Sequence, residues 1–507
     1  MKIERTKNAA NNIVFGIVLK IYQIIVPFLI RTALIYCLGV EYLGLDSLFV
    51  SILQILNLAE LGVGSAMVFS MYKPIAEDDS VTICALMKLY KIYYRIIGLI
   101  ILVIGILICP LIPNLIKSDL PEGLNVYILY LMNLFATVLS YWLFAYKNCL
   151  LQAHQRNDVI SKITIGVYTL RYVAQFLVLF YLKDYYIYLI ITLLAQVIIN
   201  ITTALIVNKK YLNYKANGKL DKSVVKDINQ RVKDLFTSKL GLVIVNSADT
   251  VVISAFLGLT VLAVYQNYYY IITAIIGIVG VIFSSCSAGI GNSLVVESEE
   301  KNYNDLKKFT FIIIWIAGIC TCCLLCLFQP FMKWWVGEEL LLSFPCVICL
   351  CIYYYIYEIN FLFTTYKDSA GIWYKDKYRT LITALTNFIM NIILVNFIGI
   401  YGVILSTVLS TLIIGMPWLL HNLFTEIFKQ NMKLYILKLL KYTVTVLIMA
   451  VITYLICNFI EGYSIISLLL KGIICFSISN IIWISIYRKS DEMKDTINIV
   501  KRILKRT

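Results

Sequence analysis

Charged residues are scarce in this sequence of 507 residues, of which only 14% are charged and 61% are hydrophobic. A soluble globular protein of this composition would have too few polar side chains to cover its surface. The mean hydropathy is +0.84, and apolar runs of about 20 residues recur along the chain, a length that suits helices crossing a bilayer. We therefore predict an all-α, polytopic membrane protein.

Catalytic signatures are missing as well. The two histidines, His154 and His421, are not part of an H-E-x-x-H pattern, and no G-x-S-x-G or Walker sequence occurs. No predicted outer loop is large enough to house a polymerase or ligase site. The sequence thus predicts a membrane transporter and not an enzyme, with no nucleotide hydrolysis on this chain.

Cysteine is plentiful, with 14 residues, but most of them lie in apolar runs. Cys320 and Cys323 have C-x-x-C spacing, as do Cys346 and Cys349. Metal knuckles of this kind lie on turns with further ligands nearby, whereas these pairs lie inside predicted membrane spans. We favour small buried hydrophobic side chains over a metal or disulfide, and we expect no cofactor beyond a coupling H⁺ or Na⁺.

The apolar runs predict about fourteen spans, and almost all of the 44 Lys and Arg residues fall in the N-terminus, alternate loops and the tail. This alternation predicts that both termini are cytoplasmic, and it accounts for the +15 net charge without nucleic acid as a partner. No signal-peptide cleavage pattern follows the basic start, so we expect the first span to remain as an anchor. The predicted spans are 11–38, 45–70, 83–109, 124–147, 160–182, 185–207, 235–258, 261–289, 309–332, 341–363, 380–397, 400–424, 439–460 and 464–487.

A weak repeat relates the spans before and after the basic inner loop 208–234. The first span ends in Leu38-Gly39 and the seventh in Leu257-Gly258, each followed by three residues, a leucine and a small residue. Six spans separate the two copies, so both halves must have the same orientation, with a cleft between two bundles. We predict six-helix bundles at 1–207 and 235–424, the linker 208–234, which can contact anionic lipid headgroups, and two further helices with a basic tail at 425–507.

The repeat extends to polar residues within spans: Arg171 and Gln175 in the fifth span match Asn387 and Asn391 in the eleventh. Small residues at helical spacing in the eighth span, from Thr273 to Gly291, suit either close helix packing or a cavity wall, and packing is favoured.

Charged residues within spans are the main functional candidates, because a charge in the membrane must be paired or hydrated. Lys20 and Arg31 are eleven residues apart, so they point to the same side of the first helix; Arg171 is the third cation. The acidic residues are Glu60, Asp249 and Glu358.

Repeat positions place Arg31 and Asp249 at similar depth, so they could pair in one conformation or form a permanent structural pair. Glu60 lies on one broad polar face of its helix with Asn57. Glu358 lies among tyrosines, which fits either proton uptake or a membrane interface.

Several short motifs together resemble a known family. Their order and spacing over about residues 1–425 are similar to those of polysaccharide transporters of the MOP superfamily, the Wzx-type flippases, which are related to MATE exporters and lipid II flippases. The motifs are Leu38-Gly39-x-x-Tyr42-x-Gly44-Leu45, Ala59-Glu60-Leu61-Gly62-Val63-Gly64, Tyr72-Lys73-Pro74, Asn246-Ser247-Ala248-Asp249-Thr250, Leu257-Gly258, Ala370-Gly371 and Tyr378-Arg379.

The resemblance implies two MATE-like bundles around a central cavity. It implies alternating-access transport of undecaprenyl-pyrophosphate-linked oligosaccharide from the inner to the outer leaflet of the bacterial plasma membrane, for capsule, O-antigen or exopolysaccharide. The expected partners are this substrate, membrane lipids, glycosyltransferases and a polysaccharide polymerase.

A diphosphate in a low-dielectric medium needs cations, so Lys20, Arg31 and Arg171 are the candidate substrate-binding residues. The candidates for gating or ion coupling are Glu60, Asp249, Glu358, Asn57 and Asn246. A MATE-like exporter of cationic drugs would need an acidic cavity, against which the three cations argue. A lipid II flippase needs the same cationic cavity and stays open as an alternative.

Overall fold

The computed structural model describes residues 5–60, 62–117, 120–121, 123–372, 375–460 and 462–504, and in these ranges every regular element is a helix. Eleven helices are long and apolar enough to cross a membrane, or up to 12 if the bent pair Val126–Trp142 and Ala145–Ala153 forms one span. The all-α membrane fold is therefore confirmed, and the predicted number of fourteen is approximate.

Two predicted spans account for the difference. The span at 45–70 is divided between α2 (Val40–Leu56) and α3 (Val63–Ala76) by a 3₁₀ turn, η1 (Asn57–Glu60). The span at 235–258 is the end of a longer helix, α9 (Lys222–Leu257), in which only Val243–Leu257 counts as an apolar stretch.

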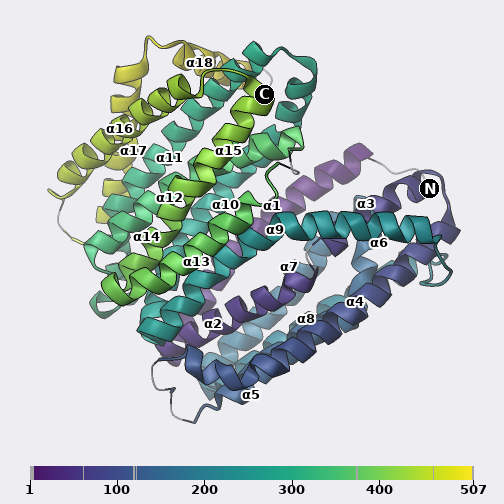
Figure 1. The fold of residues 1–507 in the computed structure, drawn as a ribbon. Helices are drawn as coiled ribbons and strands as arrows, with labels where there is room; N and C mark the ends of the chain where they lie inside the picture. The colour runs from purple at the N-terminus through teal and green to yellow at the C-terminus, as the bar shows by residue number, and fades with distance from the viewer. Residues whose placement is uncertain are drawn as a thin grey trace. The chain divides into compact units, whose positions relative to one another are not determined.

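The chain divides by its contacts into two compact units, residues 1–263 and 264–507. Figure 1 labels the helices of both units. In unit 1, α1 packs along α7, α2 along α9, and α5 along α4 and α8. Its remaining elements are α1 (Arg5–Cys37), α4 (Ser80–Ile108), η2 (Cys109–Leu115), α5 (Val126–Trp142), η3 (Ala145–Lys147), α6 (Asn148–Ala153), α7 (Asn157–Leu177), η4 (Val178–Leu182) and α8 (Tyr185–Lys210).

In unit 2, α11 packs against α12, α16 and α17 around an aromatic core that includes Phe311, Tyr442, Trp483 and Tyr487. The two helices predicted to lie outside the repeat, α16 and α17, are thus an integral part of this unit. Its elements are most of α10 (Leu259–Val296), α11 (Glu299–Val336), η5 (Glu338–Leu340), α12 (Phe344–Ala370), α13 (Arg379–Ile398), α14 (Ile400–Ser410), η6 (Thr411–Gly415), α15 (Met416–Leu423), η7 (Phe424–Phe428), α16 (Met432–Cys457), α17 (Ile465–Tyr487) and α18 (Asp491–Leu504).

Much of the predicted linker 208–234 is helical, since α8 extends to Lys210 and α9 begins at Lys222. Between them the chain lies against α4, where Lys88 Nζ donates to the Gly218 carbonyl at 3.1 Å. In the structure α9 packs with unit 1. The bundle boundaries at 207 and 235 remain a prediction.

Glycine permits a close approach between two backbone segments of unit 1. A Cβ atom at Gly44 would lie 2.4 Å from the Leu259 carbonyl oxygen. That oxygen belongs to the backbone, so it cannot move aside as a flexible side chain would. Gly44 therefore lets α2 approach the turn that follows α9.

Matching backbone turns support the repeat. The glycines that end its two motifs both have positive φ, 126° at Gly39 and 94° at Gly258. Both follow a long helix and lead directly into the next one. Positive φ is costly for residues with a side chain, so the paired Leu-Gly motifs reflect the same sharp reversal of the chain.

Matching hydrogen bonds support it too. Gln175, on α7, donates from Nε2 to Thr192 Oγ1 of α8 at 2.9 Å. Asn387, on α13, donates from Nδ2 to Thr407 Oγ1 of α14 at 2.9 Å. Both amides are fully buried, and a buried polar group needs such a partner. A bond from a buried amide to a threonine thus joins α7 to α8 and α13 to α14.

Candidate functional site

Two arginines and an aspartate come together in unit 1. Asp46, near the start of α2, interacts electrostatically with Arg171 of α7 and with Arg31 of α1. The hydroxyl of Tyr188, on α8, is within the electrostatic range of all three. Two guanidinium groups near one carboxyl group suit an anion, because arginine presents a fork of donors that matches a carboxylate or phosphate.

Arg171 is held in place by its own helix. Its Nε donates to Gln175 Oε1 at 3.2 Å, and its guanidinium lies 5.1 Å from the ring centroid of Tyr172 and 5.6 Å from that of Tyr168. The fully buried Gln175 is in turn fixed by its bonds to α8. The guanidinium is therefore oriented by stacking and by a rigid amide.

The packing of α1 along α7 brings together the two helices that carry Arg31 and Arg171. Between Lys20 and Arg31, Tyr22 lies against α7, with its hydroxyl 2.9 Å from Thr169 Oγ1 and its ring 6.2 Å from that of Tyr172. Arg31 is half-buried and Lys20 is exposed. The structure thus brings together Arg31 and Arg171 of the three predicted cations, while Lys20 lies about three helical turns away along α1.

A second cluster surrounds Glu60 in η1, at the break between α2 and α3. Tyr94 donates to Glu60 Oε1 at 2.6 Å, and Tyr141 donates to Glu60 Oε2 at 2.8 Å. Tyr141 also donates to Asn57 Oδ1 at 3.2 Å, and Tyr90 donates to Tyr94 at 2.5 Å. The predicted pair Asn57 and Glu60 is therefore brought together, in a setting of three tyrosine hydroxyls from α4 and α5.

This cluster fixes the interruption of the helix. The carboxylate is an acceptor with two oxygens, and each receives one hydroxyl. Gly62, next to the break, adopts a left-handed conformation with φ 88°. Glu60 thus ties η1 to α4 and α5 at the position where the helical hydrogen bonds of this predicted span are interrupted.

Asp249 is buried on α9, with 9% of its surface exposed. Two residues earlier, Ser247 Oγ lies 3.4 Å from Gln54 Oε1 of α2. The predicted pairing of Arg31 with Asp249 remains a prediction. The side chain of Asn246, the other candidate on this helix, lies outside the described residues.

Glu358, on α12 of unit 2, is fully buried. Neither carboxylate oxygen has a hydrogen-bond partner among the residues that the structure describes. Tyr354, one helical turn earlier, is also fully buried, and its hydroxyl has no hydrogen-bond partner among the described residues. An ionised carboxylate in such a setting would cost several kcal/mol, so Glu358 stands apart from the other acidic candidates.

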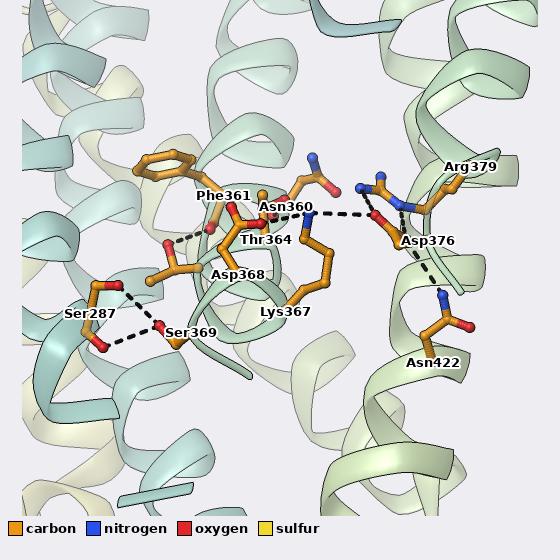
Figure 2. A network of polar contacts seen from close by, with 11 residues as sticks. Ser287, Asn360, Phe361, Thr364, Lys367, Asp368, Ser369, Asp376, Arg379 and Asn422 are labelled. Carbon is orange, nitrogen blue, oxygen red and sulfur yellow. Dashed lines mark hydrogen bonds and ion pairs between the residues drawn. The ribbon is translucent and has the colours of Figure 1, made fainter. Parts of the chain in front are cut away.

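The small residues of the eighth predicted span pack against another helix. Ser287, on α10, has its hydroxyl 3.0 Å from that of Ser369 on α12 (Figure 2). Cβ atoms added at Gly280 and Gly291 would meet Phe361 and Ser369 at 3.9 and 3.4 Å. These contacts support the interpretation as a packing face.

Sequence patterns gave no indication of a buried ion network at the start of α13. Figure 2 shows Arg379 in a two-pronged contact with Asp376, from Nε to Oδ1 at 2.6 Å and from Nη2 to Oδ2 at 2.9 Å. Lys367 lies 3.6 Å from the same carboxylate, and Asn422 donates to it at 3.5 Å.

Unit 1 repeats this device at the start of α7. Arg156 contacts both oxygens of Asp158 at 2.8 and 3.2 Å, and Lys162 contacts it at 3.2 Å. Both aspartates are buried. These contacts fix the turn into α7 and α13, the helices that carry Gln175 and Asn387, so the networks position helices and are not themselves candidates for binding.

Asp46 is the residue of the arginine cluster that the sequence analysis missed. It lies near the predicted start of the second span. A charged residue is common at the end of a membrane helix, so Asp46 was not counted among the charges within spans. Asp46 lies five residues after Glu41, close to the Leu-Gly motif, and this position alone could have drawn attention to it. Nothing in the sequence indicates that it pairs with a residue of α7.

Comparison with known proteins identifies the family and the fold. The model of the family described as "Polysaccharide biosynthesis protein" matches residues 9–287. The chain belongs to this family. No curated protein matches its sequence at a significant level.

Among solved structures, the lipid II flippase MurJ in an inward closed conformation matches with a TM-score of 0.70 at 17% identity, over 94% of this chain and 99% of that one. An inward-facing MATE family multidrug resistance transporter of the MOP superfamily matches with a TM-score of 0.60 at 16% identity, over 82% and 94%. A point mutant of the Vibrio cholerae MATE transporter VcmN matches with a TM-score of 0.54 at 15% identity, over 83% and 98%. The fold is thus that of MOP superfamily transporters, and the resemblance stated from the motifs is confirmed.

Proposed function

We propose that this member of the polysaccharide biosynthesis protein family is a flippase. It moves an undecaprenyl-pyrophosphate-linked oligosaccharide from the inner to the outer leaflet of the bacterial plasma membrane by alternating access, for synthesis of a surface polysaccharide. Its termini are cytoplasmic, and glycosyltransferases and a polymerase act before and after it. The protein itself catalyses no covalent step.

The cluster of Arg31, Asp46 and Arg171 carries this proposal. A diphosphate that passes through a low-dielectric medium requires cations that stay charged, and arginine does so at any physiological pH. Three helices contribute to the cluster, so a movement of α1, α2 or α7 changes the spacing of the two guanidinium groups. The polysaccharide family match and the MOP fold support a lipid-linked substrate.

Asp46 has a positioning role in this mechanism. In the absence of substrate its carboxylate balances the two arginines, whose charges would otherwise repel each other. The diphosphate group, with its greater charge, displaces Asp46 from the guanidinium groups. Asp46 then competes with the diphosphate for the two guanidinium groups. This competition favours release of the substrate and restores the original contacts.

Glu358 is the proposed coupling residue. Because its carboxylate is buried without a partner in the described residues, it holds a proton in this conformation. A conformation that opens α12 to water or to a cation such as Na⁺ would release the proton. Proton or sodium exchange at Glu358 then supplies the energy for returning the transporter to its starting state.

The test is glycan export in cells that depend on this protein. Arg31→Ala and Arg171→Ala should each abolish surface polysaccharide while the protein still inserts at the wild-type level. Lys183→Ala, at an exposed turn outside the cluster, serves as the control and should export normally. Unchanged surface polysaccharide in the arginine variants would refute the proposal, and rescue of a lipid II flippase deficiency would redirect it to the cell-wall precursor.

A further inference from the structure

Three cysteines from three helices meet in unit 2. The sulfur atoms of Cys326 on α11, Cys457 on α16 and Cys475 on α17 all lie within 4.8 Å of one another. The Cys457 and Cys475 sulfurs are 3.5 Å apart. All three residues are at most 5% exposed, and Cys323 packs against them from one helical turn before Cys326. We propose that this cluster binds a thiophilic metal ion, Zn²⁺ or Cu⁺.

The sulfur spacing fits such an ion. A zinc–sulfur bond is about 2.3 Å long, so neighbouring sulfurs of a tetrahedral site are about 3.8 Å apart. One pair of sulfurs is 3.5 Å apart and all three lie within 4.8 Å of one another, so small rotations of the side chains would form the site. Sulfur ligands select Zn²⁺ and Cu⁺ over harder cations.

Cys323, which packs against the three cysteines, is the candidate for a fourth ligand. It is three residues from Cys326, and side chains three residues apart lie on the same face of a helix. The pair therefore directs two sulfurs from α11 at the sulfurs of α16 and α17. Cysteines that serve only as small apolar side chains would not be expected to gather their sulfur atoms at one point.

Charge balance also favours the site. Three thiolates and one Zn²⁺ leave a single negative charge, which would be costly in an apolar setting. Lys471 is buried to 7% exposure and lies one turn before Cys475 on α17, and its carbonyl oxygen is 3.8 Å from Cys457 Sγ. We expect the Lys471 ammonium group, on the same helix as Cys475, to offset this charge.

Metal binding would join α16 and α17 to α11. The site contains none of the residues of the proposed transport mechanism. Its role is to fix the C-terminal helices, and thiol protons are released as the metal binds.

The test uses the full-length protein purified in detergent, reduced, freed of metal with a chelator and then loaded with Zn²⁺ or with Cu⁺. We expect about one tightly held equivalent per chain. The Cys326→Ser/Cys457→Ser/Cys475→Ser variant should lose it. Cys320→Ser/Cys349→Ser changes two half-buried cysteines outside the cluster and should retain it. If the wild-type protein retains only Zn²⁺ or only Cu⁺, the retained metal is the ion that the site binds.

Co²⁺ in place of Zn²⁺ provides a spectroscopic check, because thiolate ligands give it an intense near-ultraviolet charge-transfer band. The milder variant Cys475→Ala, which should fold as the wild type does, is expected to lose this band and the rise in melting temperature on loading. Equal metal content in wild type and triple variant, or a wild-type protein without the band, would overturn the proposal. So would a Cys457–Cys475 disulfide that persists after reduction.

Discussion

Replacing Glu60 with Gln is the sharpest single perturbation of unit 1. The carboxylate accepts from Tyr94 at 2.6 Å and from Tyr141 at 2.8 Å, one hydroxyl at each oxygen. Gln keeps the shape but has one acceptor oxygen and an NH₂ group, so one tyrosine must face a donor. A hydrogen bond to a charged group contributes about 1.5–3 kcal/mol, and we expect Glu60→Gln to lower the free energy of unfolding by about this amount.

A double-mutant cycle separates this bond from general damage. Tyr94→Phe should cost about 1–2 kcal/mol in the wild type and much less in the Glu60→Gln background, because the partner is already changed. The measurement is reversible unfolding in mixed micelles. Glu77→Gln is the matched control: its carboxylate is 59% exposed and 3.9 Å from Lys73, so it should change stability by less than about 0.5 kcal/mol. If Tyr94→Phe lowered the free energy of unfolding equally in both backgrounds, the hydrogen bond from Tyr94 to Glu60 would be refuted.

Three further predictions concern packing and charge. Gly44→Ala places a Cβ 2.4 Å from the Leu259 carbonyl oxygen and should cost about 1–3 kcal/mol of unfolding free energy, whereas Gly166→Ala, with open space around it, should be neutral or stabilising. Arg379→Lys keeps the charge but not the two-pronged contact with Asp376, so its melting temperature should fall while that of the exposed Arg95→Lys does not. Burial lowers the pKa of His154 below its usual 6.5. The unfolded state therefore binds more protons than the folded state. The contribution of neutral His154 to stability is full above pH 6.5 and is lost as the pH falls through the lower pKa of the folded state. His154→Phe, which keeps a ring beside Tyr211, should not show this loss when melting temperatures are measured over a series of pH values.

Sequence reasoning predicted the helical membrane class and the repeat, because hydropathy and turn chemistry are local properties. Gly39 and Gly258 are informative in this sense: a sharp reversal between helices requires a residue that tolerates positive φ, whatever the rest of the chain does. The buried amides of Gln175 and Asn387 could be singled out for the same reason, since a lone amide in an apolar run needs a partner.

The partners of the charged residues could not be predicted. Depth in a span follows from position along the sequence, but the rotation of one helix against another depends on packing that no single sequence pattern records. Similar depth suggests that Arg31 could pair with Asp249, which stays a prediction, but depth gives no hint that Asp46 lies in the field of Arg31 and Arg171. The thiol cluster is a similar case, since Cys326, Cys457 and Cys475 are far apart in the sequence and meet only through helix packing.

Binding of the diphosphate of a lipid-linked sugar by Arg31 and Arg171 can be measured as flipping of a fluorescent undecaprenyl-pyrophosphate oligosaccharide in proteoliposomes. The readout is the fraction that becomes accessible to a membrane-impermeant quencher. We expect rapid flipping by the wild type and by Lys183→Ala, and none above empty vesicles by Arg31→Ala/Arg171→Ala. Wild-type flipping by the double-arginine variant would contradict this role of the two arginines.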